Sequence, residues 1–149
     1  MCLKLAIDYP ERVLGQGKVG EYEWMVIHNT YGYRCGYVRI PIGHPWYQLD
    51  YNDVHEDSDV HIHGGLTFAE SDQSCGKGED NGWWLGFDCA HGGDAPDPKL
   101  VMEHMDRFYT SFLPDLGMHG TVRTQEYVEQ QCRSLCEQAA ARMDVGFCT

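Results

Sequence analysis

Several features that would identify a common protein class are missing from this sequence. No apolar run approaches the roughly 20 residues that a membrane-spanning helix needs. No signal peptide is recognisable, because the opening segment Met1–Asp8 is short and reaches an acidic residue early. The seven cysteines form no Cys-x-x-Cys pair, so a four-cysteine zinc site is not supported. We therefore expect a cytoplasmic chain with free thiols and no contact with a membrane.

Positive charge is also scarce. The chain has 11 Lys and Arg against 23 Asp and Glu, which gives a net charge of −12. A protein that binds duplex nucleic acid normally presents a basic face to the phosphates, so we expect no direct binding to a duplex. Neither a P-loop nor a Gly-x-Gly-x-x-Gly motif is present, which argues against an NTPase or a dinucleotide fold. The acidity suits a solvated surface or a basic protein partner.

The length and the hydrophobic content of 42% are typical of a single globular domain over residues 1–149. Residues 1–20 and 46–59 are expected to be irregular. Alternating apolar residues predict strands at Glu21–His28 and Tyr33–Ile40, joined by a turn. Two more strands are expected at Val60–Phe68 and Trp83–Cys89, and the second of these is apolar enough to be central.

Helical spacing is found in the C-terminal third. Leu100–Phe112 has apolar residues at helical spacing, and a firmer helix follows Thr124, a plausible N-cap. Its apolar stripe should face the sheet, so Cys132 and Cys136 are interpreted as core residues. The predicted fold is α+β: an antiparallel sheet of about four strands packed with a long C-terminal helix. The stripe consists of Val128, Cys132, Leu135, Cys136, Ala139 and Met143.

Residues with chemical potential are concentrated in two short segments, His63–Thr67 and Trp83–Asp94. They hold imidazoles, carboxylates, a thiol, paired tryptophans and glycines, and the second segment ends where a strand should become a loop. Loops on a rigid scaffold are common places for function. The two segments therefore indicate where the site lies but leave its chemistry open.

A metal site is one interpretation of these segments. His61 and His63 are two apart and would share one face of a strand, where a divalent metal such as zinc could be completed by Asp88, His91 or Asp94. The alternative is that one histidine is exposed and the other caps a turn. The metal candidates are His61, His63, Asp88 and His91.

Acid–base and thiol chemistry are further alternatives. Asp88 and Asp94 could form an acid–base pair, or Asp88 could orient His91, but both carboxylates could equally cap loops. We favour the cap for Asp94. Cys35 and Cys89 could act as nucleophiles if a histidine lay close, but a buried and inert thiol is the favoured interpretation.

Arginine and aromatic residues suggest a ligand. Arg34 and Arg39 lie at the ends of one predicted strand near several tyrosines, and this combination suits a nucleotide whose base stacks while guanidinium holds phosphate. The alternative is ordinary strand packing with the arginine heads in solvent. The predicted ligand-binding residues are Arg34, Tyr37, Arg39, His44, His63, Thr67, Trp83, Asp88, His91 and Asp94.

Motifs over about residues 22–142 resemble a family of small bacteriophage-encoded proteins of uncharacterised function. The resemblance implies an accessory phage protein in the cytoplasm of an infected bacterium. Such proteins often counter host defences by sequestering nucleotide signals or by blocking a defence protein, an analogy at the level of the class. The motifs are Gly32–Val38, Gly43–Pro45, His63–Thr67, Trp83–His91, Gly93–Asp94 and Thr124–Val128.

We therefore expect a binding protein for a small anionic, nucleotide-like ligand that performs no turnover. A metal-dependent hydrolase using the histidine and aspartate residues is the first alternative. An acidic inhibitor of a host defence protein is the second, and the net charge of −12 is its only support. A homo-oligomer is compatible with each of the three.

Overall fold

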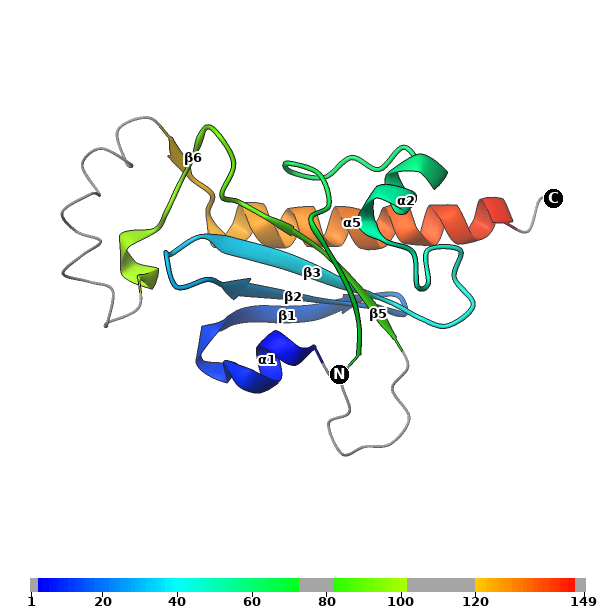
Figure 1. Cartoon of the computed structure of the whole chain (residues 1–149), viewed down its shortest axis with the longest axis horizontal. Coiled ribbons are helices and arrows are strands. Elements are labelled where there is room, and N and C mark those ends of the chain that lie inside the picture. The colour runs from blue at the N-terminus through cyan, green and yellow to red at the C-terminus, as the bar shows by residue number, and fades with distance from the viewer. Residues whose placement is uncertain (1–2, 73–81, 102–119, 147–149) are drawn as a thin grey trace.

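The computed structural model describes residues 3–72, 82–101 and 120–146. Within these ranges, a five-stranded antiparallel sheet is packed with one long helix, which confirms the predicted α+β class (Figure 1). The strand order is β1-β2-β3-β5-β4, and β6 pairs in parallel with β7. The elements are α1 (Lys4–Asp8), η1 (Pro10–Arg12), β1 (Val13–Val19), β2 (Tyr22–His28), β3 (Arg34–Ile40), α2 (Tyr51–Asp57), β4 (Phe68–Ser71), β5 (Trp83–Asp88), β6 (Asp94–Ala95), η2 (Pro98–Leu100), β7 (Thr121–Val122) and α5 (Gln125–Gly146).

Strand β1 lies in a stretch that was expected to be irregular because of its glycines. A Cβ atom at Gly17 would stand 2.6 Å from the ring of Trp24, which pairs with it across the ladder. A Cβ atom at Gly15 would stand 2.8 Å from the Gln125 side chain at the start of α5. These glycines therefore make room for a large ring and a helix within a regular strand, and this is why their turn-like appearance was misleading.

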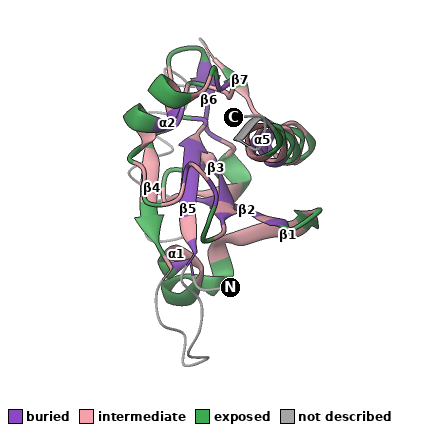
Figure 2. Cartoon of the chain, turned by 90° about the vertical axis from the view of Figure 1, so that its right-hand side faces the viewer, coloured by how far each residue is buried: buried purple, intermediate pink, exposed green. Residues whose placement is uncertain are grey.

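Helix α5 covers one face of the sheet, and α1 lies on the other. Figure 2 shows the two helices on opposite sides of β1 and β2. Five of the six predicted stripe residues are fully buried against the sheet, whereas Met143 is half-buried. The five are Val128, Cys132, Leu135, Cys136 and Ala139. Thr124 forms the expected N-cap, because its Oγ1 accepts a hydrogen bond from the Tyr127 backbone N–H at 3.1 Å. No helix in the described ranges combines the length and apolar character needed to cross a membrane.

The alternation in β2, which the sequence predicted, directs side chains to two separate cores. Trp24 and Val26 face α5, whereas Met25 and Ile27 face α1. The α1 side is a smaller cluster that also holds Tyr37. The sheet is thus buried on both faces, and the larger core lies under α5.

The predicted strand at Val60–Phe68 is wrong over most of its length, because β4 begins only at Phe68. Before that point, the chain runs along α5 and bonds to glutamine side chains. The backbone N–H of His61 donates to Gln138 Oε1, and that of His63 donates to Gln131 Oε1, each at 2.9 Å. Helix side chains thus satisfy backbone groups that a neighbouring strand would otherwise satisfy.

Two other stretches also differ from expectation. The connection at 46–59 contains α2, whose start is fixed by the Asp50 side chain accepting from the Tyr51 N–H. Of the predicted helix at 100–112, only the first two residues are described. Leu100 is the last residue of the short 3-10 helix η2, and Val101 follows it. Residues 102–112 lie outside the described ranges.

The packing of α5 can be tested with Leu135→Ala. We expect the free energy of unfolding to fall by about 2–5 kcal/mol, because a fully buried leucine is replaced by a cavity. Glu137→Ala on the exposed side of the same helix is the matched control, with an expected change within about 0.5 kcal/mol. Equilibrium urea unfolding measures both. A Leu135→Ala protein as stable as the wild type would contradict the packing described.

Candidate functional site

The carboxylate of Asp94 is the centre of the candidate site, and its side chain is only 1% exposed. Its Oδ2 accepts hydrogen bonds from His63 Nε2 at 2.8 Å and from the His91 backbone N–H at 3.0 Å. Its Oδ1 accepts from Arg123 Nε at 2.7 Å. Asp94 lies in β6, His63 lies between α2 and β4, and Arg123 immediately follows β7. One buried carboxylate therefore joins three segments that are distant in the sequence.

His63 is fixed on both sides of its ring. Because Nε2 faces a carboxylate, this nitrogen carries a hydrogen and donates it. The other nitrogen, Nδ1, lies 2.9 Å from the hydroxyl of Tyr127 in the first turn of α5. In the neutral imidazole, Nδ1 accepts the Tyr127 hydrogen, so the three side chains form a continuous carboxylate–imidazole–hydroxyl chain.

A second histidine–carboxylate pair lies beside the first, with the His63 and His91 ring centroids 6.1 Å apart. His91 Nε2 is 3.3 Å from Asp88 Oδ1, but it is buried and makes no hydrogen bond within the described residues. Asp88 instead accepts from the Thr67 hydroxyl at 2.9 Å and from the Ala90 N–H at 3.1 Å. We define the Asp94 cluster as His63, Thr67, Asp88, His91, Asp94, Arg123 and Tyr127.

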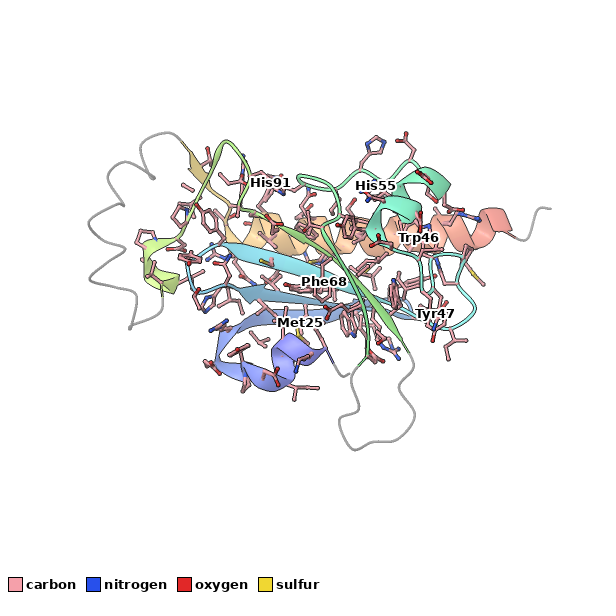
Figure 3. The ribbon with its side chains drawn as sticks, viewed as in Figure 1. Met25, Trp46, Tyr47, His55, Phe68 and His91 are labelled. Atoms are coloured by element: carbon pink, nitrogen blue, oxygen red, sulfur yellow. The ribbon has the colours of Figure 1, made fainter. Side chains whose placement is uncertain are left out.

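Glycines shape the surroundings of the cluster. Gly64 has a φ of 69°, and a Cβ atom there would overlap the ring of His91, so the ring lies directly against glycine backbone. Gly92 and Gly93 are exposed, and a Cβ atom at either would meet nothing within 4 Å. The surface next to His91 is therefore open to an approaching molecule. Figure 3 shows His91 on the side of the molecule where α5 begins.

The electrostatics of the site favour a charged Asp94 and neutral thiols. Burial acts to raise the pKa of Asp94, but the bonds from His63, Arg123 and the His91 N–H outweigh it and hold that pKa below its ordinary value. Burial also raises the pKa of Cys89 and of Cys35 to about 12. Neither cysteine supplies a thiolate at neutral pH, which agrees with the interpretation of both as inert thiols.

The structure brings five of the ten predicted ligand-binding residues together. The two segments that the sequence singled out therefore lie together in the fold, while ligand binding there stays a prediction. These five are His63, Thr67, Asp88, His91 and Asp94.

The two predicted arginines have intramolecular partners instead. Arg34 lies beside the cluster, but its three nitrogens bond to Gln125 Oε1 at 3.3 Å, to the carbonyl of Arg123 at 2.9 Å and to Asp97 Oδ2 at 3.1 Å. Arg39 lies further along β3 and bonds twice to Asp72 Oδ2, at 2.8 and 3.0 Å. Both guanidinium groups act in packing within the chain.

The other three predicted residues lie away from the cluster. The His44 ring is buried between the Ala139 carbonyl and the Trp46 N–H, toward the C-terminal half of α5. The indole N–H of Trp83 donates to the Leu49 carbonyl at 2.8 Å. Tyr37 is buried on the α1 face of the sheet. Although these three residues lie within the sequence motifs, the fold does not bring them to the Asp94 cluster.

Of the four candidate metal ligands, His63, Asp88 and His91 lie in the Asp94 cluster, whereas His61 does not. The His61 side chain is 81% exposed and pairs with Asp59 at 3.2 Å, so it does not share a site with His63. In the described part of the chain, no three His, Cys, Asp or Glu side chains are arranged to hold a metal ion. The alternative expectation was one exposed histidine and one that caps a turn. His61 is exposed, whereas the His63 ring bonds to Tyr127 and Asp94, which lie far from it in the sequence.

Arg123 and Tyr127 were not among the predicted ligand-binding or metal-binding residues, although Tyr127 lies within the motif Thr124–Val128. The N-cap at Thr124 places both within one turn of the start of α5, which was the available signal. Local spacing in the sequence indicated no partner for either residue. His63 is 64 positions away from Tyr127, and Asp94 is 29 positions away from Arg123. Only the tertiary fold brings these residues together.

Comparisons with known proteins found no relative. No protein-family model matches the chain, and neither curated proteins nor solved structures gave a match. The similarity to phage proteins therefore stays a prediction, and the function must be inferred from the site itself.

The role of Asp94 can be tested with Asp94→Asn. We expect the free energy of unfolding near neutral pH to fall by about 3 kcal/mol, because Arg123 and His63 lose their shared carboxylate. Because the folded pKa is lowered, this stabilisation is complete above the unfolded pKa of about 3.9 and is lost as pH falls through the folded value.

The deficit of Asp94→Asn relative to the wild type should thus be constant above about pH 5 and shrink below about pH 4. Denaturant unfolding across this range measures it, with the exposed Asp59→Asn as control. A deficit that is absent, or that grows as pH falls, would contradict the assigned role.

Proposed function

We propose that this chain binds a small, phosphate-bearing ligand of the nucleotide type at the Asp94 cluster, without converting it. The unused part of Arg123 is the observation that carries the proposal. Its Nε is bound to Asp94, whereas its terminal nitrogens have no hydrogen-bond or ion-pair partner among the described residues, and the side chain is 28% exposed. A guanidinium with a free edge matches the geometry of phosphate.

The remaining groups favour a nucleotide over a bare phosphate. Arg123 offsets the charge of Asp94, which leaves Asp88 as an uncompensated, partly exposed carboxylate when the histidines are neutral. A carboxylate accepts hydrogen bonds from sugar hydroxyls, while Arg123 and His91 suit phosphate oxygens.

Binding without turnover is supported by the state of the reactive groups. Both ring nitrogens of His63 have partners within the chain, so neither is available for direct proton transfer to a ligand. The Cys89 thiol near the cluster is buried and has a raised pKa. The biological setting we propose, an accessory phage protein that sequesters a bacterial nucleotide signal, follows from the sequence resemblance alone.

An enzyme acting through Tyr127 is the second candidate. The Asp94–His63–Tyr127 chain has the order carboxylate, imidazole, hydroxyl, in which His63 could accept the Tyr127 proton as general base. This version of a hydrolase uses the histidine–aspartate residues without requiring the exposed His61.

The proposal predicts that Arg123→Gln weakens binding of the recognised nucleotide at least about tenfold, because a charge-assisted contact is lost. Isothermal titration against cyclic nucleotides and ADP-ribose would identify the ligand, and native mass spectrometry would show whether it stays intact. Arg133→Gln is the matched control, since Arg133 pairs with Glu129 on the exposed side of α5.

An intact retained ligand and selective weakening by Arg123→Gln would support binding. A product mass that disappears in Tyr127→Phe would support the enzyme instead. Absence of binding at high micromolar concentration across the panel, or equal binding by Arg123→Gln, would contradict the proposal.

A further inference from the structure

A cavity of about 60 Å³ lies on the face of the sheet opposite α5. The N-terminal segment α1–η1 forms one wall, and the ends of β2 and β3 form the other. It is separate from the Asp94 cluster, whose residues are not among its lining. The principal lining side chains are Leu5, Tyr9, Arg12, Ile27, Cys35 and Tyr37.

Arg12 is the unusual member of this lining. Its Nε is buried and has no hydrogen-bond partner within the described chain, and its guanidinium carbon lies 3.9 Å from the centroid of the Tyr9 ring. A buried charged donor without an acceptor is rare in folded proteins. The position of Arg12 therefore calls for an acceptor that the described residues do not supply.

The absence of a carboxylate partner distinguishes Arg12 from the other arginines. In a chain with 23 acidic and 11 basic residues, a partner should be easy to find. Every other arginine in the described ranges has one, whereas Arg12 has no ion pair with any residue that the structure describes. The pairs are Arg34–Asp97, Arg39–Asp72, Arg123–Asp94, Arg133–Glu129 and Arg142–Asp57.

The residues that line the cavity restrict which kind of hydrogen-bond acceptor can bind to Arg12 there. No Asp or Glu lines it, so no carboxylate of the lining is in direct contact with a bound anion. Leu5 and Ile27 supply hydrocarbon surface, which suits an apolar stem but not the hydration of a phosphate dianion. The cavity is small, which limits the buried part of a ligand to a small group.

We propose that this cavity binds a carboxylate carried on a short apolar stem, with the Arg12 guanidinium as its cationic partner. The planar fork of arginine matches a carboxylate, and the aromatic face of Tyr9 holds the guanidinium in place behind it. The stem contacts Leu5 and Ile27. The carboxylate belongs either to a small organic acid or to the C-terminus of a peptide, which share this chemistry.

The test is a titration of the full ¹⁵N-labelled chain with propanoate, followed by NMR at the Arg12 Nε–H and the Cys35 amide. We expect saturable shifts at both in the millimolar range, and none with the uncharged isostere propanamide. A short peptide with a free C-terminus, compared with its C-terminal amide, distinguishes the two sources. Arg12→Gln should weaken propanoate binding at least about tenfold, whereas Arg133→Gln should leave it unchanged.

Three results would overturn the proposal: no saturable shift with propanoate, equal shifts with propanamide, or tighter binding of inorganic phosphate than of propanoate at this position. Unchanged affinity in a folded Arg12→Gln variant would do the same. If that variant does not fold, the comparison of propanoate with propanamide on the wild-type chain decides the matter. Nucleotide binding at Arg123 can succeed or fail independently of these outcomes.

Discussion

A buried negative charge imposes strict demands on the chain around it, and the carboxylate of Asp94 imposes them here. Such a group is tolerated only when charged and polar donors surround it. His63, Arg123 and the His91 N–H meet this need from three different segments. Their positions in turn fix Tyr127 at the start of α5 and place the His91 ring against Gly64. The geometry of the site follows from satisfying one carboxylate.

The sequence predicted elements whose periodicity reflects their own burial. The alternation in β2 reflects the two cores on the two faces of the sheet, and the stripe of α5 reflects the larger core, so both could be predicted from the sequence. The stretch around His61 and His63 could not, because its backbone bonds to Gln138 and Gln131 in place of a strand. The candidate site was likewise predictable only in part. Two of its segments were visible as motifs, but Arg123 and Tyr127 join it only through contacts that no local spacing records.

Arginine use connects the two proposed sites. In this acidic chain, Arg34 and Arg39 are occupied by internal partners. Arg123 uses one nitrogen on Asp94 and keeps its outer edge, whereas Arg12 has a buried nitrogen with no acceptor in the described chain. The first lies at the Asp94 cluster by the start of α5, and the second lies under α1 on the opposite face of the sheet. Each proposed site thus contains an arginine whose hydrogen-bond donors are not all used by the described residues.

The orientation of the His63 ring is the most direct test of this account. Selective ¹⁵N labelling of histidine, with two-bond nitrogen–hydrogen correlation spectra, reports which ring nitrogen carries a hydrogen. The account predicts a hydrogen on Nε2, bound to the Asp94 carboxylate, with Nδ1 facing the Tyr127 hydroxyl. A His63 ring with hydrogen on Nδ1 alone, or one that exchanges freely between tautomers, would show that the Asp94 carboxylate does not organise the site.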